Sequence, residues 1–313
     1  MGKGLKEYIK EFGIGMFLVV GFTRIMRFLR MPDTILGRYS EKKHKIVERY
    51  LWKHYKYICK QKYGDLNIID NIAARKAWVF WWQGEEEAPE VVKMCINSIR
   101  KHCELEVVCL SKKNYSKYVQ IPDYIVRKAE NGTMCLAHFS DVLRFVLLYE
   151  KGGIWIDSTC LLTAQIPADI FEYPFYSLNG PFRGQEGLNW LWTSFFMLGQ
   201  KGNVLSKMMV DFYYEYWKKH DCAITYLFLD CWIRAMYRNF EEIKCLIDEM
   251  PSTDMKVFDL NAIMNLSYDR HKLNQVINNS YIHKISYKSK YVEMNEDNIT
   301  NWKYILSKVE QGS

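Results

Sequence analysis

The sequence predicts an α/β protein in which a mostly parallel sheet is flanked by helices. Strand-like runs of aromatic and β-branched residues alternate with amphipathic runs of helical length between residues 77 and 163, and this alternation is typical of a parallel sheet with covering helices. A chain of 313 residues is long enough to bury a large core, and ten Trp and twenty-two Tyr supply large side chains for it.

The predicted elements begin with a βαβ unit and end in helices. Strands are expected at 77–82 (AWVFWW), 105–111 (LEVVCLS) and 153–163, and helices at 89–103 and within 135–153. Beyond Gly202 the sequence is predominantly helical, with the clearest periodicity at 204–220 and 225–246. We therefore expect the sheet to lie mainly in the first two thirds of the chain.

The first 62 residues form a basic end on a nearly neutral body. They hold fifteen Lys or Arg against five Asp or Glu, a net charge of +10, whereas the whole chain carries +7. The longest apolar run, 14–22, is about half of the roughly 20 residues that a membrane-spanning helix needs. Because apolar residues recur at near-helical spacing between flanking cations, this segment predicts a helix that lies in the membrane interface.

A second basic stretch, 38–62, interleaves Trp52, Tyr55 and Tyr57 with nine cations. Aromatic tips and cations suit an anionic headgroup layer, and a solvated helix packed on the main domain explains the pattern equally well. A nucleic-acid-binding protein that uses the same segment is a further hypothesis. The nucleic-acid hypothesis assigns no role to the charged residues of segment 140–159, which are described next.

The cysteines and the absent motifs narrow the class of protein. Nine cysteines form no CxxC pair, and their odd number argues against a complete disulfide framework, so a reducing cytosol is expected. The motifs GxxxxGK[ST], GxGxxG, HExxH and GxSxG are missing. The sequence therefore gives no anchor for a P-loop, a dinucleotide site, a zinc protease or a nucleophile elbow.

The segment SDVLRFVLLYEKGGIWIDST, residues 140–159, contains the charged residues that are the main candidates for a functional site. Asp141 and Arg144 are three residues apart on a predicted helix and so share a face. Asp157 ends the following strand, where ligands of open α/β sheets bind. Carboxylates and a guanidinium in one cleft suit a sugar diphosphate, although a buried Asp141–Arg144 pair with Asp157 capping a turn fits the spacing as well.

This block resembles the SDxxRxxxLxxxGGxYxDxD block of DXD-containing sugar transferases with a GT-A fold. It is more closely similar to the bacterial capsular polysaccharide synthesis proteins, which often read GGxWxDxT. The resemblance covers roughly residues 77–288 and includes the opening WVFWWQGEEEAPEVVKMCINSIR. It implies a GT-A domain at 71–313, made of a nucleotide-sugar-binding half (71–200) and a mainly helical acceptor or closing part (201–313). This domain follows the basic, amphipathic, membrane-associating extension that the charge and apolar pattern predicts at 1–70.

The resemblance also implies roles for particular residues. Asp157 corresponds to the first Asp of the DXD element, and Asp141 and Arg144 contact the donor sugar; these three form the implied catalytic set. Trp82 is the expected stacking partner of the nucleobase, with Trp81 as its rival. The other implied donor-binding residues are Ser158, His283, Lys284 and Lys288, of which the last three also fit an exposed basic strand.

Two further segments supply candidates for an acceptor or sugar pocket. The segment 186–203 either offers aromatic platforms for sugars or forms an ordinary buried strand. Its candidate residues are Asn189, Trp190, Trp192 and Ser194. Asp230 is added because an ionisable group within the apolar run YLFLDCWI needs a partner or a task.

A divalent cation, Mn²⁺ or Mg²⁺, is the cofactor that the resemblance implies, with Asp157, Thr159 and His283 as its ligands. Thr159 stands where the family has a second Asp. A hydroxyl is a weaker ligand for such a cation than a carboxylate. We therefore expect metal dependence to be reduced or to rely on His283.

Together these features predict a glycosyltransferase of capsular or surface polysaccharide synthesis. It is expected to move a hexosyl unit, with retention, from a nucleotide sugar such as a UDP-sugar to an undecaprenyl-diphosphate-linked glycan. It is expected to act in the cytoplasm at the inner face of the cell membrane, bound to anionic lipid through residues 1–62, with no nucleic-acid partner. The alternative is a membrane-associated scaffold that kept the fold but lost activity, which the Thr159 departure permits.

Overall fold

The structure is a computed structural model that describes residues 3–60, 76–180, 191–253, 255–296 and 298–310. Its centre is a five-stranded sheet in the order β2-β1-β3-β6-β5. The strands are β1 (Lys76–Phe80), β2 (Glu106–Leu110), β3 (Gly153–Ile156), β5 (Phe175–Ser177) and β6 (Phe196–Gly199). β1 pairs in parallel with β2 and β3, whereas β6 runs antiparallel to β3 and β5. The predicted α/β class is confirmed, with β6 as the one opposing strand of this sheet.

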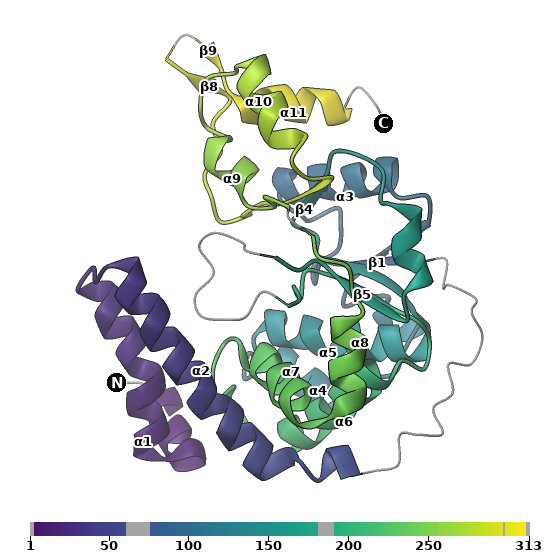
Figure 1. Cartoon of the computed structure of the whole chain (residues 1–313). Coiled ribbons are helices and arrows are strands. Elements are labelled where there is room, and N and C mark those ends of the chain that lie inside the picture. Colours follow the sequence, from purple (N-terminus) through teal and green to yellow (C-terminus); the bar gives the residue numbers. More distant parts are fainter. Residues whose placement is uncertain (1–2, 61–75, 181–190, 254, 297, 311–313) are drawn as a thin grey trace.

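Helices cover both faces of the sheet (Figure 1). On one side lie α4 (Asp123–Glu130), α5 (Leu136–Glu150), α6 (Val204–Lys219), α7 (Phe228–Asn239) and α8 (Glu241–Asp248). On the other lie α3 (Glu90–His102), α9 (Asp259–Ile263), α10 (Arg270–Ile277) and α11 (Asn301–Glu310). Alternation along β1 builds the two cores, because Trp78 and Phe80 pack toward α5 while Ala77 and Val79 pack toward α3.

Smaller elements connect these layers. They are the short helices η1 (Ile58–Lys60), η2 (Tyr115–Lys117) and η3 (Ala168–Glu172), and the strands β4 (Cys160–Leu162), β7 (Ile282–Lys284), β8 (Met294–Asn295) and β9 (Asn298–Ile299). β4 pairs with β7, and β8 pairs with β9, each as a separate antiparallel ribbon. The β4–β7 ribbon links the C-terminal part of the chain to the end of β3.

Two predicted elements are divided in the structure. The strand expected at 153–163 becomes β3 and β4, because the chain turns after Asp157 and the Cys160 amide donates to the Asp157 carbonyl (2.9 Å). The helix expected at 225–246 becomes α7 and α8, because Phe240 has an extended backbone (φ −137°, ψ 109°). The first division places a turn at the end of β3, closed by this hydrogen bond from Cys160 to Asp157.

Gly153 brings β3 close to β1. Its φ is +106°, and a Cβ at this position would lie 2.4 Å from the Lys76 carbonyl oxygen. Glycine is therefore required both by the backbone conformation and by the space. The neighbouring Gly152 carbonyl accepts a hydrogen bond from the Trp78 indole (2.8 Å). These contacts fix where β3 begins, and with it the position of the residues that follow the strand.

The N-terminal helices α1 (Lys3–Phe28) and α2 (Asp33–Tyr55) form a hairpin at one side of the molecule (Figure 1). α1 is broken at Gly13, whose φ is +79°. Before this break, the Tyr8 hydroxyl donates to the Ile224 carbonyl (2.6 Å), and the Glu11 carboxylate lies 3.0 Å from His220 Nδ1. The first half of α1 is thus attached to the chain that follows α6.

The α2 helix packs on α7. The Glu48 carboxylate lies 3.1 Å from Arg238 Nε, and Trp52 packs beside Trp232 with ring centroids 6.1 Å apart. Tyr55 is buried. For segment 38–62 we expected either a helix packed on the main domain or a position in a lipid headgroup layer. The structure shows α2 as the packed helix, and the buried Tyr55 does not lie in a headgroup layer.

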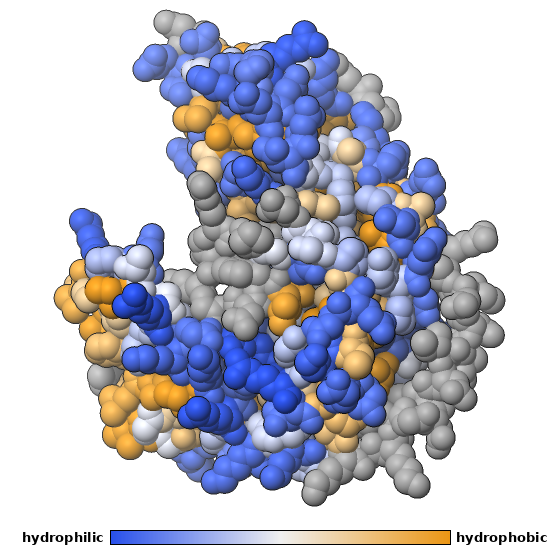
Figure 2. Space-filling view, viewed as in Figure 1, coloured by the Kyte–Doolittle hydropathy of each residue, from blue (hydrophilic) through white to orange (hydrophobic). Residues whose placement is uncertain are grey.

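Beyond Gly13, α1 presents an apolar stripe to the outside. Its members are three or four residues apart and therefore lie along one side of the helix. They are the exposed residues Ile14, Leu18, Phe22 and Ile25, followed by Leu29 directly after the end of the helix, and we call them the α1 stripe. Figure 2 shows apolar residues gathered over this hairpin. Within the described residues, no helix combines the length and the apolar character that crossing a membrane requires.

Candidate active site

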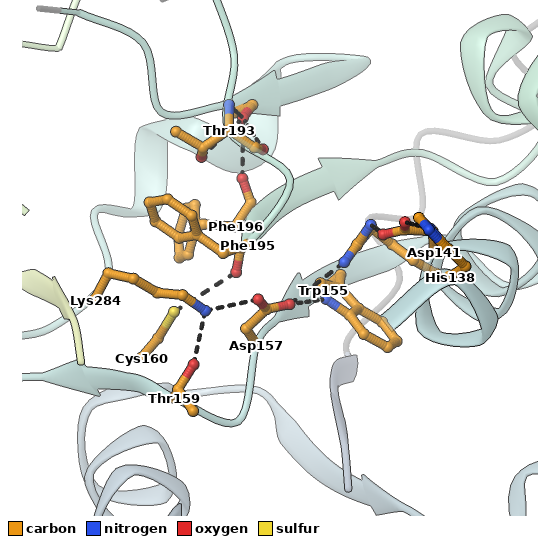
Figure 3. A network of polar contacts seen from close by, with 12 residues as sticks. His138, Asp141, Trp155, Asp157, Thr159, Cys160, Thr193, Phe195, Phe196 and Lys284 are labelled. Carbon is orange, nitrogen blue, oxygen red and sulfur yellow. Dashed lines mark hydrogen bonds and ion pairs between the residues drawn. The ribbon is translucent and has the colours of Figure 1, made fainter. Parts of the chain in front are cut away.

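Asp157 is the centre of a polar cluster at the carboxyl end of β3 (Figure 3). Its Oδ1 accepts a hydrogen bond from the Trp155 indole (2.8 Å) and lies 3.4 Å from Arg144 Nη2. Its Oδ2 accepts a hydrogen bond from Lys284 Nζ (2.7 Å). Since β1 and β3 are parallel neighbours, both end at this edge of the sheet, where open α/β proteins bind ligands.

The α5 helix contributes Asp141 and Arg144 to the cluster. Arg144 Nη1 donates to Asp141 Oδ1 (2.6 Å), as the spacing of three residues predicts. The Arg144 side chain is only 2% exposed and reaches Asp157 with its other terminal nitrogen. The structure therefore brings the three expected catalytic residues together, and Asp157 is bound by cations and does not merely cap a turn.

The charges of the cluster stabilise one another. Burial disfavours the ionised form of Asp157, but Lys284 and Arg144 outweigh burial and hold the pKa of this carboxyl below its ordinary value. Burial likewise opposes the charge of Lys284, and Asp157 more than compensates, so the pKa of the ammonium lies above its ordinary value. Both groups are therefore charged near neutral pH.

Lys284 arrives from the C-terminal part of the chain on β7. In the antiparallel β4–β7 ribbon, Lys284 is paired with Cys160, directly after the turn that holds Asp157. Its ammonium donates to Asp157 and also to Thr159 Oγ1 (2.7 Å). The expected approach of Lys284 to the cluster is thus present, whereas Lys288 is exposed in the turn beyond β7 with its ammonium 5.7 Å from the ring centroid of Tyr287.

His283 does not join the cluster. Adjacent residues of a strand point to opposite faces, so His283 faces away from Lys284. Its ring is fully buried, and Nε2 lies 3.2 Å from Thr163 Oγ1. Burial lowers the pKa of His283 to about 4. The geometry therefore separates His283 from Asp157 and Thr159, with which it was expected to share a metal ion.

The residues around Asp157 do not fit a divalent cation. The two oxygens that would face it, Asp157 Oδ2 and Thr159 Oγ1, both accept hydrogen bonds from Lys284. A hard divalent cation prefers several carboxylate or carbonyl oxygens. In the described parts of the chain, no group of three or more His, Cys, Asp or Glu side chains is arranged to hold a metal ion.

Trp81 and Trp82 follow β1 directly and lie on opposite sides of the sheet. Trp82 packs edge-on against Phe139 of α5, with ring centroids 5.1 Å apart. Trp81 packs edge-on against Tyr287, with ring centroids 5.2 Å apart. Both indoles are half-buried. Trp82 therefore lies on the α5 side of the sheet, and Trp81 lies beside the turn that carries Lys288.

The remaining candidates fall into three environments. Asn189 and Trp190 lie outside the described residues. Ser158 is buried beside Asp157, and Ser194 is half-buried just before β6. Trp192 is buried, and its indole donates to Asp230 Oδ1 (2.9 Å).

Asp230 has the partner that its apolar sequence context demanded. Burial raises the pKa of Asp230 to about 6, the hydrogen bond from Trp192 opposes this rise, and the negative charge of Asp141 adds to it. The influence of Asp141 shows that Asp230, at the start of α7, belongs to the surroundings of the same cluster. Its carboxyl changes its charge state near pH 6.

Sequence reasoning missed three residues that contact or influence the cluster. Trp155 lies two residues before Asp157, and His138 three residues before Asp141, so same-face spacing was a usable signal for both. His138 Nδ1 lies 3.6 Å from Asp141 Oδ2. Tyr213, from α6, gave no such signal, and its buried hydroxyl has no hydrogen-bond partner among the described residues. Burial and the charge of Asp141 raise the pKa of this hydroxyl, and Arg144 opposes the rise.

His138 adds another positive charge beside Asp141. Burial alone would lower the pKa of His138, but Asp141 and Cys135 together raise it to about 9. Burial also disfavours the Cys135 thiolate, and His138 outweighs burial, so the pKa of this exposed thiol lies below its ordinary value. Cys135 and the other eight cysteines are all described, and none forms a disulfide.

Comparisons with known proteins found one matching family model and similar solved structures. Among solved structures, the chain is similar to "PaToxG Glycosyltransferase", with 13% sequence identity and a TM-score of 0.38 over 77% of this chain and 99% of that chain. No curated protein sequence matches the chain. A family model described as "Capsular polysaccharide synthesis protein" matches residues 30–303. Because this match spans far more than half of the sequence, the chain belongs to the capsular polysaccharide synthesis protein family.

Proposed function

We propose that the protein is a glycosyltransferase that moves a hexosyl unit from a nucleotide sugar, such as a UDP-sugar, to a lipid-linked glycan during capsular or surface polysaccharide synthesis. The observation that carries this proposal is the joining of Asp141, Arg144, Asp157 and Lys284 in one cluster at the carboxyl ends of β1 and β3. Membership of a capsular polysaccharide synthesis family supports the biological setting.

The charges of the cluster suit a sugar diphosphate. Carboxylates such as Asp141 accept hydrogen bonds from sugar hydroxyls, and Arg144 holds Asp141 in place through its bond of 2.6 Å. Lys284 offers positive charge to the diphosphate that departs. A half-buried indole after β1, Trp82 or Trp81, supplies a surface on which a nucleobase can stack.

In the proposed reaction, the bond between the anomeric carbon and the diphosphate oxygen breaks. A bond forms between the same carbon and an oxygen of the acceptor, whose proton passes to the departing diphosphate. The cluster contributes by orienting the donor and by stabilising the negative charge of the leaving group. We propose retention of anomeric configuration, as the resemblance to DXD-containing transferases implies.

The α1 stripe supports an acceptor that is linked to a lipid. Its apolar residues are exposed, and Lys10, Arg24 and Arg27 belong to the same helix. Apolar side chains between cations are typical of helices that lie in the interface of an anionic membrane. We propose that the second half of α1, rather than the whole basic segment, holds the protein at the membrane.

The proposed activity is tested by donor hydrolysis and transfer with a panel of UDP-sugars. We expect the wild-type protein to consume one donor selectively. Asp157→Asn removes the charge that pairs with Lys284 and Arg144 and is expected to reduce turnover by at least about 100-fold, which corresponds to roughly 2.7 kcal/mol. Asp169→Asn, a change of the same kind in η3, is the matched control and is expected to keep wild-type turnover.

Three outcomes separate the alternatives. Selective turnover that is lost in Asp157→Asn supports a transferase, and NMR of the product then reports whether the linkage retains the configuration. Donor binding without turnover supports the scaffold. Equal turnover by wild type and Asp157→Asn contradicts the assignment of the site.

A further inference from the structure

The geometry points to Lys284 as the cation of this active site: we propose that its ammonium takes the place of a divalent metal ion, and that the protein binds its nucleotide donor without one. This inference rests on the proposed function and adds a specific role for Lys284. Its basis is the pair of bonds of 2.7 Å that join Nζ to Asp157 Oδ2 and to Thr159 Oγ1.

The position of the Lys284 ammonium is fixed by the backbone on both sides. The Lys284 amide donates to the Val257 carbonyl (2.7 Å), and the next amide, of Ile285, donates to the Thr159 carbonyl (2.9 Å). The side chain extends over the Phe195 ring, with Nζ 5.2 Å from the centroid. Figure 3 shows the ammonium between Asp157 and Thr159. These contacts hold the Lys284 side chain in one position beside Asp157 and Thr159.

Thr159 explains why a lysine suits this place. A hydroxyl accepts a hydrogen bond from an ammonium without adding negative charge. The site around Nζ therefore holds one carboxylate, Asp157, which matches one positive charge. Without the donor, a divalent ion would leave an excess of positive charge here and would find few of the oxygen ligands that it prefers. Residue 159 and residue 284 are thus complementary to each other.

The ammonium keeps capacity for a ligand. It has three N–H donors, and the described residues accept two of them, at Asp157 and Thr159. The Lys284 side chain is 21% exposed. A hydrogen bond from an ammonium to an ionised phosphate oxygen is charge-assisted and therefore strong. We assign the third N–H to the diphosphate of the donor.

Two binding measurements on the full chain test the proposal without requiring turnover. Titration calorimetry with UDP compares affinity in EDTA and in Mn²⁺, and electron paramagnetic resonance follows free Mn²⁺ as protein is added. We expect the same UDP affinity in both conditions and no loss of the free Mn²⁺ signal without UDP. Lys284→Met is expected to weaken UDP binding by about 10- to 100-fold in both conditions. Lys272→Met, at an exposed position of α10, is the matched control and is expected to bind as wild type.

A second variant keeps the test decisive if Lys284→Met folds poorly. Thr159→Asp combined with Lys284→Ala replaces the ammonium by a second carboxylate. We expect this double variant to bind Mn²⁺ and to bind UDP only when Mn²⁺ is present.

The outcomes distinguish this inference from the proposed function. Stoichiometric Mn²⁺ binding by the wild type, or UDP binding that requires Mn²⁺, overturns the role of Lys284 and leaves the transferase proposal standing. Absence of UDP binding in every condition, together with no turnover of any donor, overturns both.

Discussion

The guanidinium of Arg144 lies over the indole ring of Trp155, with Cζ 4.9 Å from the ring centroid. The same two side chains meet again at Asp157, because the indole donates to Asp157 Oδ1 and Arg144 Nη2 lies 3.4 Å from that oxygen. Trp155 thus holds the Asp157 carboxylate by a hydrogen bond and packs against the Arg144 guanidinium that faces this carboxylate. A planar, forked group is needed to contact Asp141, Asp157 and the ring face together.

Arg144→Lys is therefore expected to reduce donor turnover, although the charge is kept. A lysine ammonium cannot reproduce the two-sided contact with Asp141 and Asp157, so we expect kcat/KM for the donor to fall by about 100-fold. Steady-state kinetics of donor hydrolysis check this. Arg234→Lys is the matched control, because Arg234 is equally buried and pairs with Glu41 of α2; it is expected to lower the melting temperature and to leave donor KM unchanged. Equal kinetic losses in both variants would contradict the prediction.

Asp230→Asn is expected to stabilise the protein at alkaline pH. The folded-state pKa of about 6 lies above the ordinary value of 3.8, so the stability linked to this group is present at low pH and is lost as pH rises through 6. Removing the charge should then raise the free energy of unfolding by about 3 kcal/mol at pH 8 and by only about 1 kcal/mol at pH 4.5, where the folded-state carboxyl is still protonated. Asparagine keeps the oxygen that accepts from Trp192.

Urea denaturation at pH 4.5 and pH 8 measures this difference. Asp248→Asn is a control of opposite sign, because Lys244 and Tyr237 hold the pKa of Asp248 below its ordinary value. That variant should be slightly less stable than wild type at pH 8. A gain in Asp230→Asn that is the same at both pH values would show that the charge of Asp230 is not its cause.

Gly153→Ala is expected to destabilise the fold strongly. The new Cβ would lie 2.4 Å from the Lys76 carbonyl oxygen, and φ is +106°, so β3 must move away from β1. We expect a loss of about 3 kcal/mol or more in unfolding free energy. Gly132→Ala has a similar positive φ of +78° but no atom within 4 Å, and it should cost about 1 kcal/mol. Thermal unfolding of the pair separates the close approach from the backbone strain.

The sequence predicted the parts of the site that depend on local spacing. Asp141, Arg144 and Asp157 lie within seventeen residues of one another, so helix and strand periodicity were sufficient to bring them together. The choice between His283 and Lys284 was different, because it depends on the register of β7 against β4. A shift of one residue exchanges the two faces of a strand, and nothing near residue 283 reveals its pairing with residue 161.

For the fold, too, local sequence patterns predicted the elements but not the contacts between distant segments. The βαβ unit from β1 to β2 and the helix α5 were predicted from periodicity, and the structure confirms them. The direction of β6 and the turn at Asp157 were not predicted, because each is decided by contacts with residues far along the chain, such as the pairing of Ile156 with Phe196. The packing of α2 on α7 likewise joins segments about 190 residues apart, as in the pair Glu41–Arg234.

The α1 stripe is expected to bind the protein to membranes. Replacing Leu18, Phe22 and Ile25 together by Ser removes the centre of the α1 stripe, whose side chains are 45–60% exposed. Each would bury apolar surface in a bilayer, and full burial of such a side chain contributes about 1.5–3 kcal/mol. We therefore expect binding to anionic phospholipid vesicles to fall at least about tenfold in a flotation assay, with turnover of a soluble donor unchanged.

The matched control replaces three exposed apolar residues outside the hairpin, Leu266, Met294 and Ile299, by Ser. This variant should float with vesicles as wild type does, because its changes lie in the C-terminal part of the chain. Raising the salt concentration should weaken binding further if the cations of α1 contribute. Equal flotation by the two triple variants would contradict the α1 stripe as the membrane contact, whereas loss confined to the α1 variant separates attachment to the membrane from the chemistry at Asp157.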